Sequence, residues 1–215
     1  MTTLDRYRGC LLGLAAGDAL GTTLEFEQPG SFEPLNDMVG GGPFNLKPGE
    51  WTDDTSMAMC LAESLVVKGA FDPVHQLETY CRWWLEGHLS VKGRCFDIGN
   101  ATRGALARFK RAPDPFCGDT SPSAAGNGSL MRLAPAPLAF ARAPGRAIAL
   151  AGESSRTTHA AAECVEACRY FAGLLLAAVS GLPKAQLLNN NYEPAMAHFL
   201  GTPLTGKVAQ IAGGS

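Results

Sequence analysis

Residues 51–69 read WTDDTSMAMCLAESLVVKG, a start rich in acids and hydroxyls followed by apolar residues at every third or fourth position. This spacing places the apolar residues on one face of a helix over 56–68. Gly69 then supplies a stop, because glycine readily adopts the left-handed conformation that ends many helices. The segment therefore predicts a core-facing helix with polar groups gathered at its N-terminal end.

Helical periodicity continues along most of the chain. Asp72 followed by Pro73 marks another helix start, because aspartate caps free N–H groups and proline suits the first helical position. Period-two alternation is nearly absent, and no repeat or low-complexity linker divides the sequence. We predict an all-α fold and a single domain over 1–215, with helices over 4–19, 56–68, 73–85, 98–109, 144–154 and 160–180 and another opening at 183.

The composition is that of a globular chain. Apolar residues make up 46% of its 215 residues and charged residues 18%, so a packed core is expected and wholesale disorder is excluded. Eighteen basic and 20 acidic residues leave a net charge of −2, which argues against a nucleic-acid partner and against a polybasic membrane anchor. The most apolar segment, 170–182, is too short to cross a bilayer.

The seven cysteines point to a reducing compartment. Their number is odd and no Cys-x-x-Cys pair occurs, which argues against a secreted disulfide framework. Asp18 interrupts the apolar stretch near the N-terminus, so this stretch is not expected to be a signal peptide. We expect a cytoplasmic protein.

The sharpest polar cluster is Thr52, Asp53 and Asp54, directly before an apolar helix. Two adjacent carboxylates beside hydroxyls offer hard oxygen ligands of the kind that suit Mg²⁺, Mn²⁺ or Ca²⁺. The same residue types also cap helices, where they satisfy free N–H groups. Both interpretations stay open from this segment alone.

Two further segments have structural as well as functional interpretations. Gly13 and Gly17 lie four residues apart and favour close packing by another helix, with Asp18 as a cap and Glu25 nearby. Asp97 is three residues before Asn100 and would share one side of a first helical turn with it. Asp97 resembles an ordinary N-cap, whereas an aspartate and an asparagine together could also grip sugar hydroxyls.

The last two features are a glycine-rich loop and a histidine. Gly126, Asn127 and Gly128 expose backbone N–H groups beside the hydroxyl of Ser129, which would suit a phosphate, although a plain Asn-Gly turn explains them equally well. His159 precedes a long predicted helix, and a lone histidine is more often structural than catalytic.

Taken in order, these motifs resemble the ADP-ribosylglycohydrolase family, the DraG-like hydrolases that remove ADP-ribose from proteins. The resemblance covers essentially the whole chain and rests on four ordered motifs, which are residues 8–25, 51–55, 96–100 and 126–132, followed by Thr158-His159. It implies a compact, orthogonal helical domain with a pair of Mg²⁺ or Mn²⁺ ions at the base of a cleft walled by loops.

The resemblance also implies roles for individual residues. Thr52, Asp53 and Asp54 would be metal ligands, and Glu25 and Asp97 would carry the chemistry at the ribose. The remaining positions would bind substrate, which is an ADP-ribosylated protein or a small ADP-ribosyl conjugate; they are Asn100, Gly126, Asn127, Gly128, Ser129 and His159.

One family motif has no counterpart here. Family members carry a second metal-binding motif, Asp-x-Asp-Thr, near the C-terminus, and nothing after His159 resembles it. Half of the expected ligand set is therefore missing from this sequence, which predicts a C-terminally incomplete domain. We expect either a hydrolase, with a completing chain or self-association through exposed core faces, or a catalytically inactive ADP-ribose-binding or scaffold fragment.

Overall fold

The computed structural model describes residues 2–187 and 203–214 and places them in helices and loops. No β-strand forms among these residues, which contain only two isolated bridges, so the predicted all-α class is confirmed. The α-helices are α1 (Thr3–Gly21), α2 (Asp53–Lys68), α3 (Pro73–Glu86), α4 (Asn100–Arg111), α5 (Pro135–Ala139), α6 (Pro144–Arg156), α7 (Ala162–Ser180), α8 (Lys184–Leu187) and α10 (Gly206–Ala212). Short 3₁₀ turns are η1 (Thr22–Leu24), η2 (Pro122–Ala124) and η3 (Asn127–Ser129).

Two predicted helix boundaries are confirmed, the end of α2 and the start of α3. Gly69 ends α2 with a φ of +61°, the left-handed conformation that glycine adopts without strain. The Asp72 side chain accepts a hydrogen bond from the His75 amide at the start of α3, and Pro73 occupies the first turn. Local sequence signals therefore set these two boundaries.

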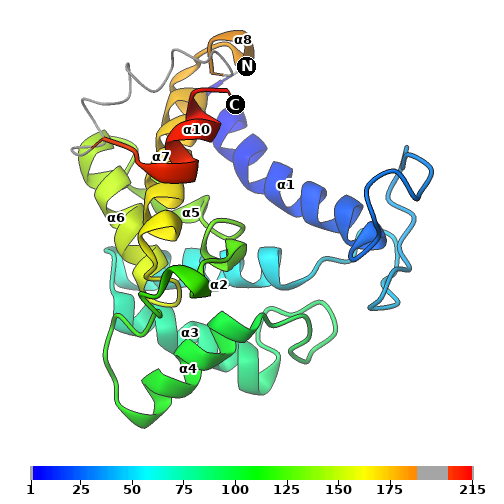
Figure 1. The fold of residues 1–215 in the computed structure, drawn as a ribbon, viewed down its shortest axis with the longest axis horizontal. Coiled ribbons are helices and arrows are strands. Elements are labelled where there is room, and N and C mark those ends of the chain that lie inside the picture. Colours follow the sequence, from blue (N-terminus) through cyan, green and yellow to red (C-terminus); the bar gives the residue numbers. More distant parts are fainter. Residues whose placement is uncertain (1, 188–202, 215) are drawn as a thin grey trace.

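The core lies where α2 and α3 meet α5, α6 and α7 (Figure 1). Its largest fully buried apolar side chains come from α2, α3, α4 and α6, and include Met57, Leu61, Leu77, Trp83, Leu106 and Ile148. The apolar face that the spacing predicts for α2 therefore points inward.

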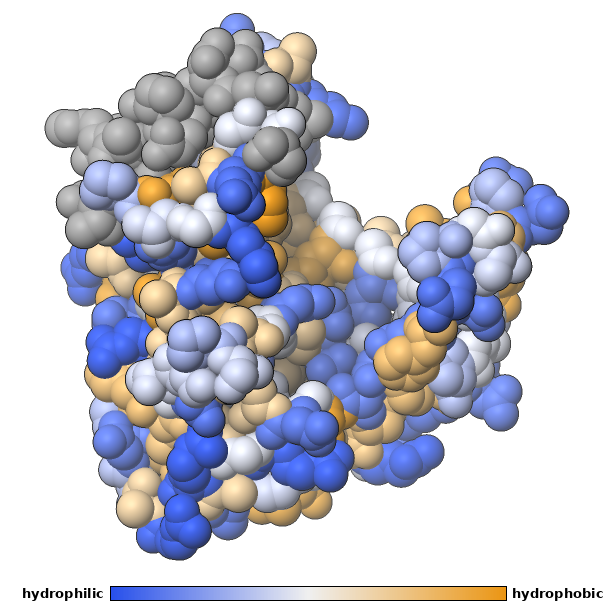
Figure 2. All heavy atoms as spheres, viewed as in Figure 1, coloured by the Kyte–Doolittle hydropathy of each residue, from blue (hydrophilic) through white to orange (hydrophobic). Residues whose placement is uncertain are grey.

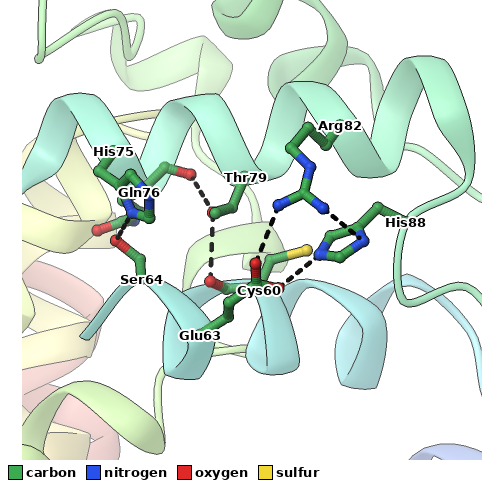
Figure 3. A network of polar contacts seen from close by, with 8 residues as sticks. All are labelled: Cys60, Glu63, Ser64, His75, Gln76, Thr79, Arg82 and His88. Carbon is green, nitrogen blue, oxygen red and sulfur yellow. Dashed lines mark hydrogen bonds and ion pairs between the residues drawn. The ribbon is translucent and has the colours of Figure 1, made fainter. Parts of the chain in front are cut away.

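A polar network joins α2 to α3 along their outer side (Figure 3). Glu63 accepts a hydrogen bond from Arg82 at 2.9 Å and lies 2.5 Å from the His88 ring, in the turn after α3. Deeper in the interface, Thr79 donates to the Cys60 carbonyl at 3.2 Å. These contacts join the middle of α2 to α3 and to the turn that follows it.

Helix α1 departs from the sequence-based expectation. It runs obliquely out of the helical body toward the loop that precedes α2 (Figure 1). The leucines at positions 4, 11 and 12 follow the three- and four-residue spacing of one helix face, yet they are exposed, and 67% of Leu12 is accessible to solvent. This spacing does not mark a buried face of α1, because within the described residues only Ala19 of this helix is buried.

The glycines of α1 also differ from their expected packing role. A Cβ built on Gly13 or Gly17 would meet nothing within 4 Å, so no helix among the described residues packs closely on them. They instead line a 600 Å³ groove between α1 and α7, opposite Phe171 and Leu175. The close-packing interpretation of the glycines is therefore wrong for this part of the chain.

Two sequence-based expectations concern the environment of the protein. All seven cysteines lie in the described part of the chain and are free, as their pattern predicts. No described helix combines the length and apolar character needed to cross a membrane.

Candidate active site

The N-terminal end of α2 is capped by a residue from another helix. Asp18, near the end of α1, accepts hydrogen bonds from the backbone N–H groups of Thr52 and Thr55 at 3.0 Å. The hydroxyls of the same two threonines donate to Asp18 at 2.8 and 2.6 Å. Asp18 therefore satisfies the free N–H groups that Asp53 or Asp54 would otherwise be expected to cap.

Because Asp18 caps α2, the side chains of Asp53 and Asp54 are not needed as caps. Thr52 is the N-cap residue by position, but its side chain makes no capping bond to the helix. Asp53 is buried, and no basic group in the described residues pairs with either aspartate. The capping interpretation of this acidic pair is wrong, and the pair is electrostatically uncompensated.

The electrostatic cost of this arrangement appears in the pKa values. Burial, with the neighbouring charges of Asp97 and Asp54, raises the pKa of Asp53 well above its usual range. Burial and the negative charge of Asp18 raise the pKa of Asp54 to about 6. Such a cluster is stabilised either by protons or by a bound cation.

Asp97 and Glu25 complete the acidic cluster from two different loops. Asp97 precedes α4, and its carboxyl is hydrogen-bonded to those of Asp53 and Glu25. Burial, followed by the charges of Glu25 and Asp54, raises the pKa of Asp97. Burial also raises the pKa of Glu25. The pKa of Asp97, about 7, suits this carboxyl group to acid–base chemistry near neutral pH.

The expected capping role of Asp97 is wrong. Helix α4 begins at Asn100, and Gly99 occupies the N-cap position without any side-chain capping bond. Asp97 lies three residues outside the helix with a φ of +58°, a left-handed conformation that aspartate tolerates better than most residues. Asn100 is therefore not its partner on one helical turn, and its side chain is exposed.

Of the acidic cluster, Glu25 and Asp54 line a hollow in the molecular surface, whereas Asp53 and Asp97 are not among the residues that line it. Figure 2 shows this hollow between the helical body and the loop that follows α1. A 310 Å³ pocket is lined by Asp18, Glu25, Thr52 and Asp54 on one side and by Asn127 on the other. The fold thus brings Glu25 of the motif 8–25 and Asn127 of the motif 126–132 to one pocket, although more than 100 residues separate them in the sequence.

The glycine-rich loop reaches this pocket with Asn127 and is held from behind by α6. Ser155 lies 2.8 Å from both the hydroxyl of Ser129 and the carbonyl oxygen of His159. Gly128 packs against the His159 ring, where a Cβ would come within 2.8 Å of Cε1. Gly126 and Asn127 are exposed, whereas Ser129 and His159 are buried.

The sequence of this chain matches the family model described as ADP-ribosylglycohydrolase over residues 1–212. The chain belongs to the ADP-ribosylglycohydrolase family. The ADP-ribosylarginine hydrolase Tri1 of Pseudomonas putida (strain GB-1) is 49% identical over 185 residues, which are 86% of this chain and 50% of the relative. The ADP-ribosyl-[dinitrogen reductase] glycohydrolase of Rhodospirillum rubrum is 39% identical over 142 residues, covering 63% of this chain and 45% of that protein.

A solved structure shares the fold of this family member. The ADP-ribosylglycohydrolase-related protein complex superposes with a TM-score of 0.83 at 44% identity, covering 99% of this chain and 68% of the other. This chain spans about half the length of the curated relatives that it matches.

The ligand chemistry of the acidic cluster fits the hard divalent cation that the family resemblance implies. Asp53 and Asp54 carry uncompensated oxygen ligands, and Thr52 adds a hydroxyl whose hydrogen is directed to Asp18. However, in the described ranges no three Asp, Glu, His or Cys side chains are arranged to hold a metal together. Within the described residues, 52–54 could therefore supply only part of the ligand set that a divalent cation needs.

Sequence reasoning missed two residues of this site. Thr55 was quoted within the motif but given no role, and it is one of the donors to Asp18. Arg132 is fully buried behind the glycine loop, where it donates to the Gly128 carbonyl. A lone basic residue inside the apolar run 130–140 was the signal that could have revealed it.

Proposed function

We propose that this chain binds ADP-ribose and is the ribose- and phosphate-binding part of a divalent-metal-dependent hydrolase that removes ADP-ribose from modified proteins. The observation that carries this proposal is the capping of α2 by Asp18, which leaves the buried Asp53 and the half-buried Asp54 beside Glu25 without a basic partner in the described residues. Two relatives are named as an ADP-ribosylarginine hydrolase and an ADP-ribosyl-[dinitrogen reductase] glycohydrolase. These names support a protein-linked ADP-ribosyl substrate.

The phosphate groups of the ligand would lie at the glycine-rich loop. Gly126 and Asn127 are exposed at this loop, and backbone N–H groups can hold a diphosphate without a strongly basic surface. A net charge of −2 is consistent with this mode of binding. Asn127 lines both the acidic pocket and a 400 Å³ cavity on the other side of the loop, so a ligand could span the two.

The ribose and the scissile bond would lie over the acidic pocket. Asp97, whose pKa is raised by burial and by Glu25, holds a proton that it can give to the leaving group. Glu25 lies at the pocket mouth and can orient the ribose hydroxyls or accept a proton from water. When bound at Thr52, Asp53 and Asp54, Mg²⁺ or Mn²⁺ would supply Lewis-acid activation of water and orient the ribose diol.

A second function, ADP-ribose binding without turnover, is favoured by one observation. Among the described residues the metal ligands are incomplete, and a cation held by two carboxylates would be weakly bound. This binding function requires the glycine loop but not the acidic cluster.

The two functions are separated by one pair of assays on the purified chain. Release of ADP-ribose from ADP-ribosylated arginine is measured with and without Mn²⁺, and ADP-ribose binding is measured by calorimetry. Metal-dependent release supports the hydrolase, and binding without release supports the binding module. The matched variants are Asp54→Asn in the pocket and Asp114→Asn on an exposed loop, where the carbonyl of asparagine can still accept from the Phe116 amide. Only the first should abolish release.

A further inference from the structure

The buried guanidinium of Arg132 is unusual in having no anionic partner. Its side chain is 0% exposed, it lies 4.4 Å above the Tyr80 ring, and it donates to the Gly128 carbonyl at 3.0 Å. In the described part of the chain no carboxylate lies within the 4.0 Å of an ion pair. Burying a charge without a counter-ion is destabilising, so a residue kept in this state calls for an explanation.

Arg132 also determines the direction of a hydrogen-bond chain. Its second terminal nitrogen lies 2.7 Å from the hydroxyl of Thr158, and that hydroxyl lies 2.9 Å from Nδ1 of His159. A guanidinium only donates, so the Thr158 oxygen accepts from it and can direct its own hydrogen to His159 Nδ1. The reverse arrangement, with a proton on Nδ1, would leave the hydroxyl hydrogen of the buried Thr158 without an acceptor.

This chain of donors decides which edge of the His159 ring carries the hydrogen. With Nδ1 as acceptor, the neutral ring is protonated at Nε2, an atom that makes no hydrogen bond within the described residues. The Nε2 edge faces the glycine loop: a Cβ would come within 3.1 Å of Nε2 from Gly128 and 3.8 Å from Gly126. Burial and the charge of Arg132 lower the pKa of His159 to about 4, which keeps the ring neutral at physiological pH.

We propose that Arg132 and Thr158 are positioning residues that hold His159 with its hydrogen on Nε2, ready to donate to a phosphate oxygen of a ligand at residues 126–129. This inference rests on the proposed function, because it requires a phosphate-bearing ligand at that loop. The negative charge of the diphosphate would then offset the buried guanidinium, which polarises both the Gly128 carbonyl and the Thr158 hydroxyl.

The tautomer of His159 can be read directly by ¹⁵N NMR on the wild-type chain without any ligand. We expect Nε2 to carry the hydrogen and Nδ1 to show the shift of a hydrogen-bonded acceptor at pH 7. A hydrogen on Nδ1 would overturn the proposal. This measurement does not depend on ADP-ribose binding, so it separates failure of the hydrogen-bond chain from failure of the proposed function.

Binding measurements on Thr158→Val and Thr158→Ser test the consequence of this arrangement. Valine keeps the volume but removes the hydroxyl, whereas serine keeps the hydroxyl. With calorimetry, we expect Thr158→Val to weaken ADP-ribose binding about tenfold and to leave adenosine binding unchanged, and Thr158→Ser to restore wild-type affinity. Equal losses for ADP-ribose and adenosine, or no loss for either, would contradict the positioning role. Thr158→Val is preferred to Arg132→Met, because removing the buried guanidinium risks misfolding.

Discussion

Asp18 and Thr55 are 37 residues apart in the sequence, and their side chains meet at 2.6 Å. The Asp18 carboxylate also accepts a hydrogen bond from the backbone N–H of Thr55, so the end of α1 caps the first turn of α2. A carboxylate near the end of α1 thus caps α2 in place of a side chain of α2 itself. Its consequence is that the buried Asp53 and the half-buried Asp54 are not needed to cap α2.

Replacing Asp18 by alanine should destabilise the fold. The substitution leaves two backbone N–H groups and two hydroxyls at the start of α2 without their acceptor, and each buried unsatisfied donor costs about 1–3 kcal/mol. We expect the free energy of unfolding in urea to fall by about 2–4 kcal/mol. The control Asp37→Ala changes an exposed loop aspartate and should shift it by less than about 0.5 kcal/mol. Equal effects of both variants would contradict the capping role.

Asp53→Asn should stabilise the metal-free protein at alkaline pH. The folded state raises the pKa of Asp53, so the native chain binds more protons than the unfolded chain from about pH 4 upward, and stability falls as pH rises. Asparagine removes this penalty, so we expect a gain of about 1–2 kcal/mol at pH 8 that disappears near pH 4. Denaturant titrations in EDTA at the two pH values measure it. A variant less stable than wild type at pH 8 would refute the electrostatic account.

His159 should make the protein sensitive to acid. Its pKa falls from 6.5 in the unfolded chain to about 4 in the folded chain, so the unfolded state binds more protons in this interval. Above pH 6.5 the His159 ring is neutral in both states and does not make the stability depend on pH. As the pH falls from 6.5 toward 4, protonation of the unfolded chain lowers the free energy of unfolding. The stability difference between wild type and His159→Asn should therefore shrink by about 3 kcal/mol over this interval and stay constant above it. A difference that does not change with pH would count against a buried neutral imidazole.

Gly128→Ala should weaken ADP-ribose binding. The new Cβ would lie 2.8 Å from His159 Cε1 and 3.3 Å from the Thr102 hydroxyl, so the ring or the loop must move. We expect at least a tenfold loss of affinity, measured by calorimetry. Gly145→Ala is the matched control, because a Cβ there meets nothing within 4 Å. Unchanged affinity in Gly128→Ala would mean that the loop is not the phosphate site.

Apolar spacing predicted that most of these helices exist but not which of their faces are covered. Gly69 and Asp72 fix the boundaries of α2 and α3 by local chemistry, which a sequence can reveal. On α1 the same spacing failed, because a periodic apolar face does not indicate whether another element packs against it. The sequence offered Asp18 as a possible cap, but local rules do not reveal that it caps α2, whose Thr52 lies 34 residues further along the chain.

This difference can be measured on two leucines. Leu61 is fully buried in α2, whereas Leu12 is exposed on α1. We expect Leu61→Ala to lower the free energy of unfolding by about 2–5 kcal/mol and Leu12→Ala to change it by less than about 0.5 kcal/mol. A large loss in Leu12→Ala would show that the α1 face is covered in solution.

The sequence identified the individual residues of the candidate site but not their arrangement in space. Spacing alone left Asp53, Asp54 and Asp97 as possible caps, and the family resemblance assigned them to one centre. Their convergence with Glu25 depends on how α1, α2 and the loop before α4 meet in space. Arg132 ends the motif 126–132 but received no role, because the sequence does not show that this residue is buried beside the glycine loop.

The most direct test is a calorimetric titration of the purified chain with Mn²⁺ and ADP-ribose together. We predict that ADP-ribose binds, that Mn²⁺ binds more tightly in its presence, and that Asp54→Asn abolishes the Mn²⁺ signal while Asp114→Asn does not. Absence of both ADP-ribose binding and Mn²⁺ uptake in the folded wild-type chain would contradict the account.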